Sequence, residues 1–252
     1  MASEEEWEFY YCRVDDAPAS IFLNLAYRDE RPEDSDALYY AGLQMLAPGE
    51  HGMGEEPDVG DLWKLEDAIV EAATAAGFTY VGRLRNNGDW QLTFYAAPDK
   101  EEELEQLVVD QLSESERGYR IGSQEDDAWK YYEEFLFPDA ERWQWIMNRR
   151  VVQQLSEAGD TADVPRDVDH FIHFDDAAKR DAFLAAAQKI GFRGEGGEEE
   201  NSELPYSAHL VREDPVELDH IHDVVMELVE LADEHGGEYD GWGAPVATRE
   251  PS

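Results

Sequence analysis

The chain has 252 residues, which is enough for one large domain or two small ones. A hydrophobic content of 42%, with 12% aromatic residues, provides material for packed cores and excludes a disordered chain. The formal net charge is −40, and a chain this acidic lacks the clustered bases that bind phosphates, which argues against direct nucleic-acid binding and against docking on anionic membranes.

The first half of the chain alternates between strand and helix patterns. The segment Asn86-Asn87-Gly88, between two β-rich runs, is a strong hairpin signal because Asn-Gly supplies the positive φ values of a type I′ turn. Asp58 or Asp61 stands where the first long helix needs a capping side chain. In chain order the patterns predict strands at 7–14, 18–27 and 37–46, a helix at 62–76, strands at 78–85 and 90–96, a helix opening at 98–99, a strand at 118–124 and an aromatic helix at 128–137.

The second half continues this alternation. Apolar and polar residues alternate over 168–174, which is typical of a strand and places His170 on the apolar face as a hydrogen-bonded core residue. Gly194 to Glu203 is rich in Gly and Glu and predicts a loop that cannot pack. Asp214-Pro215 predicts a helix N-cap followed by proline at the first helical position. The predicted elements are helices at 139–158 and 178–190, a last helix that Gly236-Gly237 ends, strands at 168–174, 205–212 and 238–246, and a short strand beginning at 191–192.

The order of these elements predicts the fold class. The second half reads strand–helix–strand–strand–helix–strand, the order of a ferredoxin-like split βαβ sandwich. Residues 37–124 have the same order and follow two extra strands. We therefore predict an α+β protein with two tandem ferredoxin-like (βαββαβ) sandwiches, the first with extra N-terminal strands. The predicted domains are 1–138 and 139–252.

The acidity is spread along the whole chain. Residues 1–148 hold 35 acids and 11 bases, and residues 149–252 hold 25 acids and 9 bases. Fifteen of the bases are Arg and five are Lys. A uniformly acidic, lysine-poor surface is typical of a protein adapted to a high-salt cytoplasm, because salt screens the repulsion between its negative charges. An acidic face that occupies the basic groove of a nuclease is the alternative, and the two can coexist.

Other features place the protein in the cytoplasm. The single cysteine, Cys12, can form neither an internal disulfide nor a thiolate metal site. No stretch approaches the run of about eighteen apolar residues that a membrane span needs. The start of the chain lacks the basic and apolar regions of a signal peptide. We therefore expect a soluble cytoplasmic protein.

The sequence predicts no metal site, no cofactor and no enzymatic activity. Six of the seven histidines fall within 170–235, but His170 and His173 differ by an odd number on a strand and point to opposite faces. His220 and His222 diverge around a helix. No Gly-rich phosphate loop, Ser elbow or Cys/His nucleophile arrangement occurs.

The closing strand contains an unusual motif, Tyr239-Asp240-Gly241-Trp242-Gly243. Glycine weakens a strand unless the backbone must bend or approach another group closely. Simple alternation places Trp242 and Asp240 on one face and Tyr239 on the other. Two interpretations stay open: a kinked strand with a packed tryptophan, or an aromatic recognition surface for a partner.

This motif is part of a family resemblance. With Gly159-Asp160, Arg166 to His170 and Phe174, it resembles the RraB family, regulators of ribonuclease E activity, over about residues 148–247. The first half resembles the domain of unknown function numbered 695. The residues that carry this second resemblance are Trp7 with Tyr10, Pro18 to Ile21, the strand Phe94-Tyr95, and Asp127 to Pro138.

The RraB resemblance implies a non-enzymatic protein that binds a ribonuclease E-type nuclease and inhibits it by protein contact. On this hypothesis Trp242 is the contact anchor, and Asp240, Arg166 and Asp169 are further contact residues. Neither direct nucleic-acid binding nor membrane binding is expected. Two other classes of function stay open: an acidic neutraliser of toxin nucleases, and a small-molecule-sensing module with the first domain as the sensor.

Overall fold

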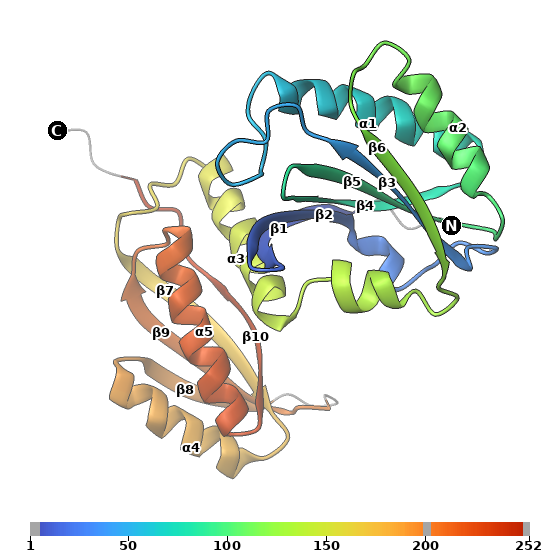
Figure 1. The fold of residues 1–252 in the computed structure, drawn as a ribbon. Helices are drawn as coiled ribbons and strands as arrows, with labels where there is room; N and C mark the ends of the chain where they lie inside the picture. Colours follow the sequence, from blue (N-terminus) through green and yellow to red (C-terminus); the bar gives the residue numbers. More distant parts are fainter. Residues whose placement is uncertain (1–5, 199–202, 249–252) are drawn as a thin grey trace. The chain divides into compact units, whose positions relative to one another are not determined.

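The computed structural model of the chain describes residues 6–198 and 203–248. The chain divides into two compact units, Met1–Asp139 and Ala140–Ser252. The first contains a six-stranded antiparallel sheet and the second a four-stranded antiparallel sheet, each packed against helices (Figure 1). The predicted α+β class is confirmed.

The first unit is built around the sheet order β1-β2-β4-β5-β3-β6. Helices α1 and α2 cover one face of this sheet, and the main apolar core lies between them and the central strands (Figure 1). The elements are β1 (Trp7–Val14), β2 (Ala17–Asn24), the 3-10 helix η1 (Leu25–Arg28), β3 (Ala37–Gln44), α1 (Asp58–Ala75), β4 (Thr79–Asn86), β5 (Asp89–Ala96), α2 (Glu101–Gln111), β6 (Tyr119–Glu125) and the π-helix η2 (Tyr131–Leu136).

The segment around η2 is tied to the N-terminal strands. The Tyr132 hydroxyl donates to the carbonyl of Asn24 at 2.7 Å, and the Tyr10 hydroxyl donates to the carbonyl of Leu136 at 2.9 Å. The ring of Trp129, just before η2, stacks on Tyr95 of β5 at 3.9 Å. The aromatic residues of this predicted helix therefore pack on the sheet and on β2.

In the first unit, one predicted turn is confirmed, whereas one strand end and one helix cap differ from the prediction. Asn87 and Gly88 have φ values of +50° and +79°, so the two-residue turn between β4 and β5 is as expected. The second strand ends at Asn24, three residues early, because the Asn24 side chain accepts from the amide of Ala26 and begins η1. Asp58 does not cap α1, since its carboxylate binds the amides of the preceding loop and the guanidinium of Arg117.

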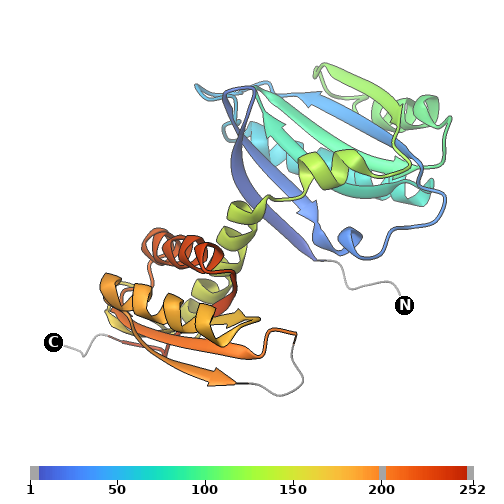
Figure 2. The ribbon, with the colours of Figure 1, turned by 90° about the horizontal axis from the view of Figure 1, so that it is seen from below.

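The second unit has the sheet order β10-β7-β9-β8. Helices α4 and α5 lie on one side of this sheet (Figure 2), and α3 packs beside α5. The core lies between the helices and the sheet. The elements are α3 (Ala140–Glu157), β7 (Arg166–Phe174), α4 (Ala177–Ala187), the 3-10 helix η3 (Gln188–Ile190), β8 (Arg193–Glu198), β9 (Tyr206–Asp214), α5 (Leu218–Glu234) and β10 (Gly237–Gly243).

The two sheets share one strand order. When four strands are numbered along the chain from β3 in the first unit and from β7 in the second, both sheets have the order 4-1-3-2. In each unit one helix follows the first of these strands and another follows the third. The tandem repetition of strand–helix–strand–strand–helix–strand is therefore present in space as well as along the chain.

Two sequence predictions for the second unit are wrong. Residues 193–198 form the edge strand β8, not a loop, because they pair with β9 and their glycines allow close packing: a Cβ on Gly194 would stand 2.5 Å from a Leu210 side-chain carbon. The remainder of that predicted loop up to residue 202 lies outside the described residues. Asp214 ends β9 and does not cap α5, because its carboxylate binds Arg212 and His220.

Candidate partner-binding site

Helices α4 and α5 cover one face of the second sheet, and its other face carries polar and aromatic side chains. The alternation along β7 is as predicted: Val168 and His170 are buried in the core, whereas Asp167 and Phe171 are exposed. We call this second surface the open face. Its residues within the described part of the chain include Asp167, Asp169, Phe171, His173, Arg193, Glu195, Ser207, His209, Val211, Glu213, Glu238 and Asp240.

The centre of the open face is an aromatic pair flanked by carboxylates. The rings of Phe171 and His209 are nearly parallel, at 6°, with centroids 5.1 Å apart. Phe171 is 42% exposed, although it is a large apolar residue. The His209 Nε2 atom lies 2.6 Å from an oxygen of Asp169, and its Nδ1 atom lies 3.9 Å from an oxygen of Glu195. An apolar contact surface and negative charge therefore occur together.

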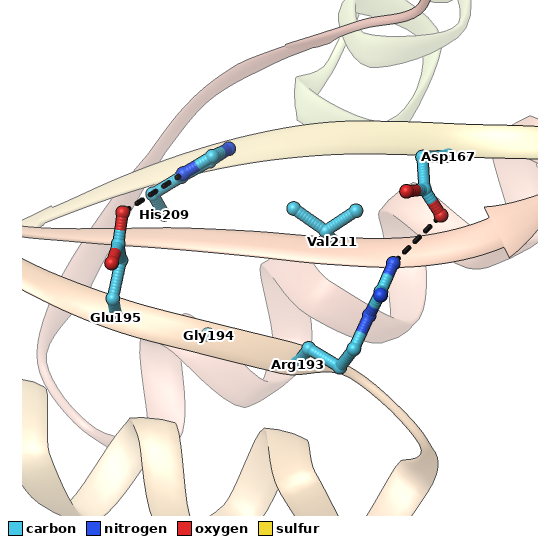
Figure 3. Close-up of a pocket in the computed structure, with 6 residues that line it drawn as sticks. All are labelled: Asp167, Arg193, Gly194, Glu195, His209 and Val211. Atoms are coloured by element: carbon cyan, nitrogen blue, oxygen red, sulfur yellow. Dashed lines mark hydrogen bonds and ion pairs between the residues drawn. The ribbon is translucent and has the colours of Figure 1, made fainter.

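A shallow cavity of about 350 Å³ lies beside this pair (Figure 3). Arg193 and Asp167 point toward one another across one end of it, 2.7 Å apart, and Glu195 and His209 do so across the other. Val211 lies between the two pairs and forms an apolar floor. The cavity thus offers both hydrogen-bonding groups and apolar surface to a side chain from another molecule.

A β-bulge changes the faces predicted for the closing strand. The register of β10 against β7 shifts between Tyr239 and Gly241, so Asp240 is an extra residue in the ladder. Tyr239 and Trp242 consequently share the core face, and Asp240 lies on the open face, 3.7 Å from His173. The prediction that Trp242 and Asp240 share a face is wrong. Gly241 has a φ of +149°, a conformation that L side chains rarely adopt.

Trp242 is a core residue. Its side chain packs in the apolar cluster of the second unit, and the residue is 8% exposed. Its indole N–H donates to the Oδ1 atom of Asn148 at 2.9 Å. Asn148 is fully buried on α3, and its Nδ2 atom lies 3.1 Å from Nδ1 of His222 on α5. Trp242 therefore links β10 to two helices and presents little surface to a partner.

Arg166 is also bound within its own unit, and it is 7% exposed. Its guanidinium contacts the carboxylate of Asp160 and donates hydrogen bonds to the backbone carbonyls of Thr161 and Val164, both at 2.9 Å. The same Asp160 carboxylate accepts from the amide of Ala247 at 2.7 Å. The Gly-Asp and Arg elements of the family motif therefore hold the loop before β7 to the segment after β10.

Two of the four predicted contact residues, Asp169 and Asp240, lie on the open face, whereas Trp242 and Arg166 are buried. Sequence reasoning missed Phe171 and His209 as site residues. The available signal was Phe171 itself, which occupies an outward position in a strand whose inward positions are already apolar. No comparable signal marked His209, because its significance depends on which strand lies beside it.

His170 is a core histidine, as predicted. It is fully buried, and its Nδ1 atom lies 2.8 Å from the hydroxyl of Tyr239. Its Nε2 atom has no hydrogen-bond partner within the described part of the chain. Burial lowers the pKa of His170 to about 4, although the nearby Asp214 carboxylate acts to raise it. The imidazole is therefore neutral at neutral pH.

This shift in pKa predicts an acid-sensitive core. In the unfolded chain a histidine titrates near pH 6.5, so between about pH 6.5 and 4 the unfolded state binds the extra proton and stability falls as the pH falls. From pH 7.5 to 5.0 the wild type should lose about 2 kcal/mol more free energy of unfolding than His170→Gln. Urea unfolding of both at the two pH values tests this. His51→Gln, an exposed control, should behave as the wild type, and equal losses in all three chains would refute the assignment.

His220 and His222, on the same helix, have different partners. His220 lies 2.8 Å from the Asp214 carboxylate, and His222 contacts Asn148. Within residues 6–198 and 203–248, no group of three or more His, Cys, Asp or Glu side chains is arranged to hold a metal ion. Over the same residues, no helix combines the length and apolar character that a membrane crossing needs.

Comparison with protein families places both units. Residues 5–137, more than half of the chain, match the family described as "Family of unknown function (DUF695)". The chain belongs to this family. Residues 145–244 of this DUF695 protein match a second family, "Regulator of ribonuclease activity B", or RraB. The RraB domain lies in the second unit and includes the open face, and both resemblances seen in the sequence are confirmed.

Two curated relatives support the RraB assignment. The chain is 27% identical over 103 residues to "Regulator of ribonuclease activity B" of Xenorhabdus nematophila, covering 40% of this chain and 73% of the relative. It is 26% identical over 117 residues to the protein of the same description from Alteromonas mediterranea, covering 45% and 88%. A solved structure of an unknown protein from Galdieria sulphuraria aligns with 82% of this chain and 96% of its own at 12% identity; its TM-score of 0.23 does not indicate a shared fold.

Proposed function

We propose that this DUF695 protein is a non-enzymatic regulator that binds a ribonuclease E-type nuclease by protein contact and inhibits it. The observation that carries the proposal is the position of the open face, which belongs to the RraB domain and combines an exposed aromatic pair with carboxylates. Regulation of this kind needs a complementary surface and no catalytic group of its own.

The chemistry of the open face favours a basic protein segment as the partner. Among the described residues, six carboxylates, those of Asp167, Asp169, Glu195, Glu213, Glu238 and Asp240, accompany one guanidinium, that of Arg193, on this surface. Charge complementarity steers association with a basic patch, while RNA is repelled by the same charges. Phe171 supplies the exposed apolar contact that hot spots require.

The predicted contact residues take two roles in this proposal. Asp169 and Asp240 contact the partner directly, with Phe171 and His209 between them on the same surface. Trp242 and Arg166 act as positioning residues, because each is buried and holds β10 or the loop before β7 in place. Losing either would impair binding only through the fold.

We also assign both units to the ferredoxin-like architecture. The support is the strand order 4-1-3-2 in each sheet, with helices after the first and third strands. Strands β1 and β2 extend the first sheet beyond this pattern. The boundary that we propose for two independently folding domains is close to residue 139.

Substitution of Phe171 tests the proposed surface. Phe171→Ser should weaken binding to a purified ribonuclease E-type endonuclease at least about tenfold, or about 1.4 kcal/mol, because it removes the apolar centre of the contact. Asp169→Asn should reduce the association rate and its dependence on salt. Titration calorimetry gives the affinity, and cleavage of a fluorescent single-stranded RNA gives the inhibition.

The matched control is Ile190→Ser, which replaces another exposed apolar residue of the same domain, 36% exposed and outside the open face. It should bind and inhibit as the wild type does. An unchanged affinity for Phe171→Ser with an intact fold would exclude the open face as the binding surface. RNA cleavage by the purified chain without the nuclease would contradict the non-enzymatic proposal.

A further inference from the structure

The DUF695 unit contains a second cavity, of about 430 Å³, between α1 and strands β1, β2 and β4. This volume lies within the range of small-molecule sites, about 300–1,000 Å³. More than half of its lining is aromatic, and none of the lysines and arginines that the structure describes lines it. The aromatic residues are Trp7, Phe22, Tyr27, Trp63, Phe78 and Tyr80.

One wall of the cavity is held in place by ring stacking. The Trp7 ring stacks on Phe22, with centroids 4.9 Å apart and planes at 14°, and on Tyr80, with centroids 5.3 Å apart and planes at 29°. The Tyr80 hydroxyl donates to the Glu66 carboxylate at 2.7 Å. A wall that is already ordered loses little conformational freedom when a ligand binds.

Helix α1 adds negative charge to this aromatic lining. Glu66 is buried, and besides Tyr80 it accepts hydrogen bonds from the indole of Trp90 at 2.6 Å and from Arg83 at 2.8 Å. Asp67 is exposed at the edge of the cavity and forms no ion pair with the residues that the structure describes. Arg83 balances the charge of Glu66, so the charge of Asp67 remains for a ligand.

Two of these rings, Trp63 and Phe22, already bind a cation of the protein together with the neighbouring Trp90. The guanidinium carbon of Arg83 lies 4.1 Å from the ring centroid of Trp63, 4.3 Å from that of Trp90 and 5.1 Å from that of Phe22. These distances are within the roughly 6 Å over which a ring face attracts a cation. These rings can therefore bind a positively charged group that is weakly hydrated.

We propose that this cavity binds a small free alkylammonium ligand. Aromatic faces and an unpaired carboxylate favour a substituted ammonium group over a neutral group of the same shape, and they disfavour anions. Thr74 and Thr79 also line the cavity and offer hydroxyl groups to a polar end of the ligand. This ligand site is independent of the open face and of the proposed nuclease regulation.

Titration calorimetry of the full chain in low-salt buffer tests the proposal with two probes. Choline carries a quaternary ammonium group, and 3,3-dimethylbutan-1-ol is its neutral carbon isostere. We expect a saturable one-to-one isotherm for choline and binding at least about tenfold weaker for the alcohol. Equal affinities would show an apolar cavity without preference for charge, and no saturation by choline would exclude the site; either result overturns the proposal.

Matched substitutions on α1 locate the site. Asp67→Asn should weaken choline binding about threefold or more, and Trp63→Leu should weaken it at least about tenfold, with circular dichroism confirming that each stays folded. Asp61→Asn makes the same change of charge beside Lys64, away from the cavity lining, and should leave binding unchanged. Equal effects of Asp61→Asn and Asp67→Asn would reduce the result to net charge and overturn the assignment. A peptide containing trimethyllysine could also be tested. If it bound tenfold more tightly than choline, the ligand would be a modified side chain of another protein, and the proposal of a free small molecule would be overturned.

Discussion

Replacing Trp242 with alanine should lower the free energy of unfolding of the RraB domain by about 3–5 kcal/mol. The change removes a large buried side chain from the core cluster and takes away one of the two donors to the Oδ1 atom of the fully buried Asn148, leaving only that of Gln144. Trp242→Phe should lower the free energy of unfolding much less, because phenylalanine keeps most of the packing and loses only the hydrogen bond. The size of the difference between the two variants separates packing from hydrogen bonding.

Peptide-resolved hydrogen exchange of the full chain measures this effect in each unit separately. Protection should fall in α3, α5 and β10 and stay unchanged in the DUF695 unit. Phe171→Ala, an exposed change on the same sheet, should alter stability by less than about 0.5 kcal/mol. If Trp242→Ala instead kept full protection but lost affinity for the nuclease, Trp242 would be a contact residue and the positioning role would be wrong.

The second large effect is expected at Glu66. Glu66→Gln should destabilise the DUF695 unit by about 3–5 kcal/mol, because it leaves the buried guanidinium of Arg83 without a countercharge. The hydrogen bonds from Tyr80 and Trp90 to the same carboxylate would also weaken. Burial, together with the neighbouring Glu66 carboxylate, raises the pKa of Tyr80, so its hydroxyl remains a donor at all ordinary pH values.

A double-mutant cycle with Arg83→Met isolates the pair. The double variant should be more stable than Glu66→Gln alone, since removing both charges leaves no uncompensated ion in the core. Asp89→Asn is the control, because Asp89 pairs with Arg120 in a partly exposed bridge, more accessible than that of Glu66 with Arg83, and should contribute less than about 1 kcal/mol. A Glu66→Gln variant as stable as this control would show that the buried carboxylate is not needed to hold Arg83.

How far the sequence predicts the candidate site differs from residue to residue. Asp169 and Asp240 were identified as contact residues and lie on the open face, but the prediction that Asp240 shares a face with Trp242 was wrong because of the bulge. Phe171 could be recognised by its outward position in an alternating strand. His209 could not, since its ring becomes part of the site only through β9 pairing beside β7.

The sequence by itself determined the features that depend on neighbours along the chain. The period-two pattern of 168–174 placed His170 in the core, the Asn87-Gly88 turn set the β4–β5 hairpin, and the order of elements indicated two similar α+β units. Each of these features depends on backbone geometry or on burial within a few residues, so the local sequence is enough to predict it.

Only the tertiary structure decided the features that depend on partners distant in the chain. The edge strand at 193–198 forms because β9 supplies its hydrogen bonds, although its glycines alone suggest a loop. Arg166 is a structural residue because Asp160 and the segment after β10 enclose it. One inserted residue at Asp240 reverses the alternation and buries Trp242, and the pairing of Glu66 with Arg83 joins a helix to a strand. Such contacts arise when separate elements pack, so no local pattern encodes them.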